Sequence, residues 1–197
     1  MRENDHWVAG EKLPINNARY AVGHPALSPD GKTLYFASDM PGGFGGADLY
    51  VVSRGESGWG QPMNLGAGIN TSGNELFPYM DAASQLYFAS DGHVGLGGLD
   101  VFMVARTGSG AWGRVQNLGY PLNSSYDDFG LALNAEGNAG LLSSNRNSDP
   151  QDDNLYSFKR FWPRFECEPQ IKNNYCYYYY ESGVLDSDSM PLAYEWD

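Results

Sequence analysis

The chain has 197 residues, of which 42% are hydrophobic and 14% aromatic, enough to bury a sizeable core in one or two domains. Its 24 acidic and 12 basic residues give a formal net charge of −12. This charge argues against nucleic acid and anionic lipid as partners, because both are bound through clustered Lys and Arg. No apolar run approaches the ~18 residues of a membrane span, so direct membrane insertion is not expected. No signal peptide is visible at the amino terminus.

A six-residue motif is written more than once along the chain. Leu-Tyr-Phe-Ala-Ser-Asp occupies residues 34–39 and returns 52 residues later at 86–91. An altered copy, Gly-Leu-Leu-Ser-Ser-Asn, follows after another 54 residues at 140–145. A fixed period of this size is typical of repeat architectures. The sequence therefore predicts one organised region of repeats, with units near residues 16–66, 67–119 and 120–161 after a leading strand in 1–15, and a different segment in 162–197.

Each unit contains four short apolar runs separated by turn residues. In the second unit these runs are residues 76–80, 86–89, 101–105 and 112–118. Runs of about 4–8 residues that are bounded by Gly, Asp, Asn and Pro are typical of strands. No amphipathic helix is evident in residues 1–161. Four strands in a unit of roughly 50 residues indicate a β-propeller blade, so the prediction is an all-β fold with about three four-stranded blades, a partial propeller.

The number of blades has a physical consequence. Propellers usually close with about 4–8 blades around a central channel. An open arc of three would leave the apolar faces of its end blades bare and would expose unpaired strand edges. Either further blades belong to a longer natural protein, which we favour, or copies of the chain associate and complete one another.

The motifs of the repeat resemble a known family. Residues 24–38, followed by Asp-Leu-Tyr at 48–50, resemble the WD40-like propeller repeat of the TolB type. Their combination with Gly-Gly-x-Gly-Gly-x-Asp, Trp-Gly, Asn-Leu-Gly and Ile-Asn resembles the propeller of OmpA-family proteins associated with the outer membrane of Bacteroidetes-type bacteria. The resemblance covers about residues 7–160. It implies a periplasmic, outer-membrane-associated location. The peptidoglycan-binding module of that family has no counterpart in this sequence, so that function is not carried over.

The segment 162–197 has a different composition. Its tyrosine-rich run at 175–180 and its final Trp-Asp resemble the opening strands of a PKD-like, immunoglobulin-type domain. Such a sandwich takes about 100 residues, so we expect an incomplete domain here. Cys167 and Cys176 are the only cysteines. In an oxidising compartment they could form a disulfide, and the alternative is that they are two buried thiols.

The sequence offers no catalytic set, and we expect no enzyme activity. It contains no Gly-x-Ser-x-Gly elbow. His6, His24 and His93 fall in different units, which favours structural roles for all three. The carboxylate pairs at 127–128 and 152–153 are adjacent in sequence, and adjacent strand residues point to opposite faces. They therefore do not supply the facing carboxylates of a glycosidase.

Some recurring residues are predicted to build the blades. Asp48 and Asp100 each follow a glycine loop, where a carboxylate can accept backbone N–H bonds and fix the turn between two strands. Trp7, Trp59 and Trp112 recur once in each unit, which indicates blade packing rather than an aromatic binding platform.

One loop is a candidate cation site. Asp149, Asp152 and Asp153, with Asn147 and Asn154, offer hard oxygen ligands within ten residues, the ligand type that calcium prefers. The spacing does not match an EF-hand, and the alternative is a plain acidic loop. Calcium is the only cofactor that the sequence suggests.

Two functions remain open at this point. The first is a non-enzymatic scaffold that presents loops and a channel to protein partners, which the resemblance places among envelope or secretion components. The second is a glycan- or peptide-binding module at the mouth of the channel. Exposed aromatic residues beside Asp and Asn at that mouth would support the second.

Overall fold

The computed structural model describes residues 2–3, 6–7, 10–146 and 152–160. These residues form fourteen strands and no helix. It follows that the described part of the chain offers no helix able to cross a membrane. The segment 161–197, with Cys167, Cys176 and the tyrosine run, lies outside the described residues.

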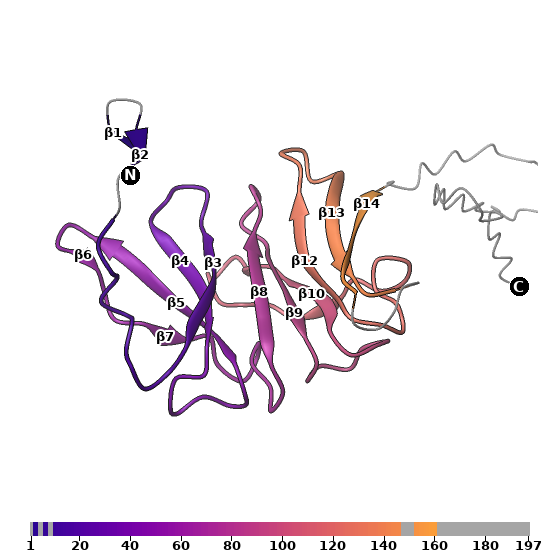
Figure 1. The fold of residues 1–197 in the computed structure, drawn as a ribbon, viewed down its shortest axis with the longest axis horizontal. Helices are drawn as coiled ribbons and strands as arrows, with labels where there is room; N and C mark the ends of the chain where they lie inside the picture. Colours follow the sequence, from indigo (N-terminus) through magenta and orange to yellow (C-terminus); the bar gives the residue numbers. More distant parts are fainter. Residues whose placement is uncertain (1, 4–5, 8–9, 147–151, 161–197) are drawn as a thin grey trace, which may run out of the picture.

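The strands form three meandering antiparallel sheets in chain order, and Figure 1 shows them side by side from violet to orange. The first sheet contains β3 (Val22–Leu27), β4 (Thr33–Ser38), β5 (Asp48–Gly55), β6 (Gly58–Trp59) and β7 (Met63–Asn64). The second contains β8 (Glu75–Met80), β9 (Leu86–Ser90), β10 (Asp100–Val104) and β11 (Gln116–Asn117). The third contains β12 (Asp128–Leu133), β13 (Ala139–Ser144) and β14 (Asn154–Lys159).

The register of the sheets defines two edges of the molecule. In the first sheet Ser38 pairs with both Val22 and Asp48, so β3 begins at the edge where β4 ends and β5 begins. The second and third sheets repeat this arrangement. We call this the loop edge, because it carries the long loops 39–47 and 91–99 and the connections 65–74 and 118–127. The opposite edge carries the tight turns between the first two strands of each sheet, and we call it the turn edge (Figure 1).

Neighbouring sheets pack face to face. We call the face turned toward the next sheet the forward face and the opposite one the rear face. Between the first and second sheets lie eleven buried apolar residues: Ala26, Tyr35, Ala37, Leu49, Val51, Ile69, Met80, Leu86, Phe88, Phe102 and Val104. Between the second and third sheets lie Tyr87, Val101, Leu131 and Leu142. Burying one such large side chain contributes about 1.5–3 kcal/mol.

This arrangement confirms the predicted fold class. Successive four-stranded meanders that stack face to face form the blades of a β-propeller, and the three sheets constitute part of one. The fourth run of the second unit is shorter than predicted, because only Gln116–Asn117 pairs with β10. An isolated bridge joins Arg106 to Trp112 just before it.

The amino-terminal part of the chain contains a short pairing of its own. Residues Arg2–Glu3 (β1) and His6–Trp7 (β2) pair with each other, and the leading strand of a further blade stays a prediction. Leu13 and Ile15 pack on the rear face of the first sheet, where Ile15 is 4% exposed. The apolar rear face of the first blade is therefore covered by the chain itself.

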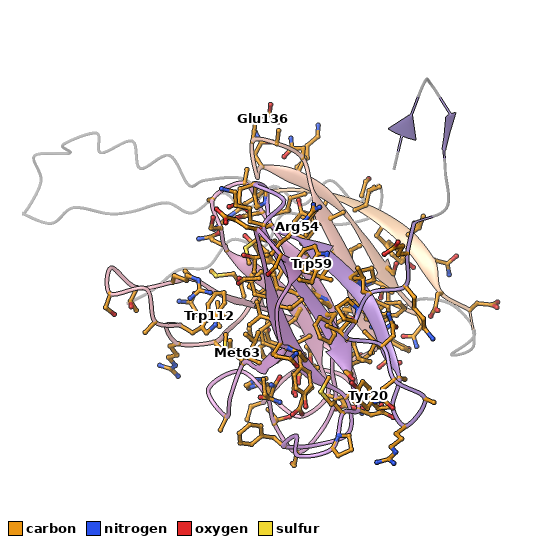
Figure 2. All side chains as sticks on the ribbon, turned by 90° about the vertical axis from the view of Figure 1, so that its left-hand side faces the viewer. Tyr20, Arg54, Trp59, Met63, Trp112 and Glu136 are labelled. Atoms are coloured by element: carbon orange, nitrogen blue, oxygen red, sulfur yellow. The ribbon has the colours of Figure 1, made fainter. Side chains whose placement is uncertain are left out.

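The tryptophans of the first two blades pack as predicted. Trp59 lies against the rear-face cluster of the first sheet, and Trp112 lies against the core between the first two sheets. Each ring also stacks with an arginine, Arg54 at 6.0 Å and Arg106 at 4.1 Å. Figure 2 looks onto the first sheet and shows Arg54 beside Trp59, with Trp112 placed lower.

Candidate functional site

The first strand of every blade carries a β-bulge at the same step. The pairing of β3 with β4 shifts by one residue between Gly23 and Ala26, and β8 and β12 shift at the equivalent places. His24 and Phe77 occupy these bulges with a φ of 50°, and Gly130 occupies the third with a φ of 61°. Positive φ is costly for bulky side chains and persists where the surrounding structure enforces it. The bulge re-aims the side chain that it carries.

The re-aimed side chains form an aromatic ladder across the three blades. The rings of His24 and Phe77 stack at 4.1 Å with an interplanar angle of 14°. Phe77 in turn packs against Phe129 at 5.0 Å. The backbone N–H of Phe77 donates to Nδ1 of His24 at 3.3 Å, so the neutral imidazole carries its proton on Nε2. Burial lowers the pKa of His24 below its ordinary value.

A cavity of about 480 Å³ opens beside this ladder, between the first and second blades at the loop edge. His24 contributes to its wall, together with polar groups of Ser38, Asp39 and Asn74. The remaining lining residues are small or apolar: Ala21, Val22, Gly23, Ala37, Gly46, Ala47 and Leu76. A volume of this size falls in the range of ligand sites.

Polar pairs hold the blades together at the same edge. Asn74 donates through Nδ2 to Asp91 at 2.8 Å and accepts at Oδ1 from the N–H of Ala47 in the previous blade, at 3.1 Å. Between the second and third blades the two residue types are exchanged. Asp127 stands at the position of Asn74, Asn145 stands at that of Asp91, and Asn145 donates to Asp127 at 3.0 Å. Asp127 joins two blades directly by accepting the N–H of Leu99, whereas Asp91 holds Asn74, which makes the contact with the previous blade.

The loop edge also presents apolar side chains to solvent. Nine large hydrophobic residues of the described part are exposed, and five of these are in loops at this edge: Phe44 (50%), Val94 (96%), Leu96 (52%), Tyr120 (72%) and Tyr126 (43%). Phe44 and Leu96 occupy the same position of the repeat, in the middle of the glycine loop. The glycine loops therefore carry an apolar tip in both of the first two blades.

The two apolar tips are held by the recurring aspartates. Asp48 accepts the N–H of Phe44 at 2.7 Å and that of Gly45 at 3.2 Å. Asp100 accepts the N–H of Leu96 at 2.7 Å and that of the following glycine at 3.0 Å. The predicted structural role of both aspartates is confirmed, and it fixes the backbone from which each tip projects.

Close contact with the next blade explains the glycines of these loops. A Cβ at Gly45 would collide with the carbonyl oxygens of Thr71 and Gly73, and one at Gly97 would collide with the carbonyl oxygen of Tyr126. Each loop thus lies directly on the connection that enters the following blade. The tips are fixed by two blades rather than one.

Two asparagines complete the support, and sequence reasoning gave them no role. The side chain of Asn70 pairs with the backbone of Leu49 in both directions, accepting its N–H at 2.8 Å and donating to its C=O at 3.0 Å. Asn123 makes the same pair with Val101. The repetition of Ile69-Asn70 as Leu122-Asn123 was the signal for this pairing.

The other predicted residues do not gather into a site. Nε2 of His93 lies 2.7 Å from the C=O of Ile69, and its ring packs on Phe102, so this histidine is structural. Asp127 faces the blade seam, whereas Asp128 is buried on Ser124 and Arg146. The side chain of His6 lies outside the described residues.

The calcium candidate is only partly within the structure. Asp152 and Asp153 are exposed, while Asp149 lies outside the described residues. Within the described ranges, no three His, Cys, Asp or Glu side chains are grouped as metal ligands would be. The calcium site therefore stays a prediction.

Comparison with known proteins gives a likeness to solved structures. No family model matches the chain, and no curated protein matches it. The crystal structure of TolB from Acinetobacter baumannii aligns with a TM-score of 0.48 and 17% sequence identity. The alignment covers 70% of this chain and 29% of TolB, so the chain spans less than a third of that protein.

Proposed function

We propose that the chain is a non-enzymatic scaffold that binds protein partners through its loop edge. The observation that carries this proposal is the set of exposed apolar side chains on that edge, two of which project from loops fixed by Asp48 and Asp100. Pre-ordered loops bind with a smaller loss of conformational entropy than mobile ones. Phe and Tyr, which make up three of the five exposed residues, are enriched at protein interfaces.

The motif resemblance supports a setting for this scaffold. On this basis the proposed setting is the periplasm, in association with the outer membrane, with cell-envelope or secretion components as the partners. The charge of −12 supports a protein partner rather than nucleic acid or an anionic lipid surface.

A glycan- or peptide-binding module at the mouth of the propeller channel is a second candidate. The cavity beside His24 combines an aromatic ring with Asp39 and Asn74, the combination that this hypothesis requires. Phe77 is covered on one side by His24 and contacts Phe129 on another, so its ring offers no free face for a sugar.

Apolar side chains of similar exposure on the two edges allow a direct test. Leu27, near the turn edge, is 53% exposed, which is nearly the exposure of Phe44 (50%) and Leu96 (52%) on the loop edge. Peptides selected from a phage-displayed random library would serve as the probe, with dissociation constants measured by biolayer interferometry. We expect Phe44→Ser and Leu96→Ser to weaken binding at least about tenfold, and Leu27→Ser to leave it unchanged.

Two controls make the result decisive. Circular dichroism must show the same fold for all three variants. An array of cell-wall glycans, tested in parallel, separates the second candidate from the first. Equal loss of peptide binding in Leu27→Ser, or binding of glycans that survives both loop-edge substitutions, would overturn the proposal.

A further inference from the structure

The forward face of the third blade exposes large apolar side chains. Leu141 on β13 is 51% exposed and Leu155 on β14 is 75% exposed. The register pairs Leu141 with Ser157 and Leu155 with Ser143. Both leucines therefore lie on the same face of the sheet, diagonally opposite each other on neighbouring strands.

The repeat shows that this kind of face is normally covered. Tyr35 and Tyr87 occupy the position of Leu141 in the first two blades and are 3% and 4% exposed. Leu49 and Val101 occupy the position of Leu155 and are 0% and 1% exposed. In both cases the cover is the rear face of the next sheet. The third blade thus carries the same packing face without a sheet on it in the described structure.

The charge on this face is unlike that of the chain as a whole. Its residues on the three strands are Ala132, Ala139, Leu141, Ser143, Leu155, Ser157 and Lys159. None of them is acidic, and Lys159, at the turn edge, is the one charged residue in this set. Two chains that each carry a net charge of −12 repel one another. The strand residues of this face bring no carboxylates together, and the nearest one, the exposed Asp153, lies two residues before Leu155 at the loop edge.

The first blade restricts how two copies can meet. In a head-to-tail arrangement, the forward face of one third blade would pack on the rear face of another first blade. Leu13 and Ile15 already cover that rear face. A two-fold contact, in which the same face of each copy meets its twin, requires no such displacement.

We propose that the third-blade forward face is a self-association surface, on which a second copy docks by two-fold symmetry. The two sheets pack face to face, with Leu141 and Leu155 of each copy at the centre of the contact. The resulting dimer leaves the loop edges of both copies free. The proposal is therefore independent of partner binding at that edge.

Light scattering of the full-length chain across a range of concentrations tests the proposal. We expect a discrete dimer that dissociates on dilution. A Leu141→Lys, Leu155→Lys double variant should raise the dissociation constant at least about tenfold, because it places four cations in the contact. The matched control is Leu27→Lys with Met63→Lys, since these residues are 53% and 63% exposed and lie outside the third blade. The control should dimerise like the unaltered chain.

Cross-linking locates the contact. In a Cys167→Ser, Cys176→Ser background, Leu155→Cys should link two copies through a short bismaleimide, whereas Met63→Cys should not. A monomer at all concentrations would overturn the proposal. Slow reaction of Cys at 155 with a thiol reagent in such a monomer would then identify the chain's own residues as the cover. Fast reaction would identify an open face. Equal disruption of a dimer by the control variant would also overturn it.

Discussion

The second and third blades fill the same buried corner with different chemistry. Glu75 and Asp128 each begin the first strand of their blade, and both are 0% exposed. Glu75 accepts hydrogen bonds from uncharged donors: the N–H and hydroxyl of Thr71, at 2.9 and 2.6 Å, and the hydroxyl of Ser90 at 2.7 Å. Asp128 accepts two similar bonds from Ser124 and also forms an ion pair with Arg146.

The difference arises where the repeat has changed. Arg146 also donates to the carbonyls of Pro121 and Leu122, so one side chain joins β12 to the connection that precedes it. In the second blade the position of Arg146 is held by a glycine, Gly92, whose N–H donates to the hydroxyl of Ser90. A buried carboxylate can therefore be satisfied by a set of neutral donors or by one cation. The two solutions respond differently to the loss of a single partner.

The largest effect is expected at the arginine. Arg146→Met leaves Asp128 buried without its cation, and breaking a buried pair in this way typically costs about 3–5 kcal/mol. Ser90→Ala removes one neutral donor from Glu75 and should cost about 1–3 kcal/mol. Urea unfolding at neutral pH measures both values.

The double change Arg146→Met, Asp128→Leu is the control. Replacing both partners by apolar groups removes the unpaired charge and should recover part of the stability. If Arg146→Met costs no more than Ser90→Ala, the third blade does not depend on its ion pair as we infer.

A smaller contrast is expected between the two loop aspartates. At Asp48 both carboxylate oxygens accept bonds, Oδ1 from Gly45 and Oδ2 from Phe44 and Asn64. At Asp100 both loop N–H groups bond to Oδ2, and Oδ1 is buried with no hydrogen-bond partner in the described structure. Asparagine at 100 can keep its oxygen on the loop and turn its NH₂ toward the unused side.

Asparagine at 48 has no favourable orientation. In one orientation its NH₂ would face the N–H of Gly45, and in the other it would face the donors of Phe44 and Asn64. We expect Asp48→Asn to cost about 1–3 kcal/mol and Asp100→Asn less than about 1 kcal/mol. Thermal or urea unfolding of the two variants gives the comparison. Equal costs would show that charge, rather than the number of acceptors, determines the stability of these loops.

The sequence predicted those features that depend on local chemistry. The motif at 34–39 and its copies located the central strand of each blade, because a short apolar run bounded by turn residues is typical of a strand. The role of Asp48 followed from its place directly after a glycine loop. These predictions needed no knowledge of how one blade lies on the next.

The features that it did not predict depend on contacts between distant segments. Arg146 reaches Asp128 across 18 residues, and nothing in the spacing marks them as a pair. Leu13 and Ile15 are too few to form a periodic pattern, so their cover over the first blade was not expected. The ladder was also missed, although His24 and Phe77 occupy the same step before a proline. In the third blade the bulge position holds Gly130, and the ring comes from Phe129, one residue earlier in the strand. No fixed period therefore relates all three rings.

The smallest expected effect is a pH dependence of the free energy of unfolding, which arises from His24 in the aromatic ladder. Burial lowers the pKa of His24 in the folded state, whereas the unfolded chain has the ordinary value of about 6.5. When the pH falls through about 6.5, the unfolded state takes up the proton first, so the free energy of unfolding decreases. The decrease from this group ends once the pH lies below the folded-state pKa. Above about pH 7.5 the group makes no contribution to the slope.

His24→Asn is the variant that isolates this contribution. Asparagine tolerates positive φ and can accept the N–H of Phe77, but it does not titrate. Unfolding free energies at about pH 7.5 and about pH 5.5 should differ less in this variant than in the unaltered chain. Leu27→Ser, which leaves every histidine in place, should retain the original difference. If both variants keep the full difference, protonation of other groups governs acid stability. The ring of His24 would then be held equally well in either charge state, and the ladder would not sense pH.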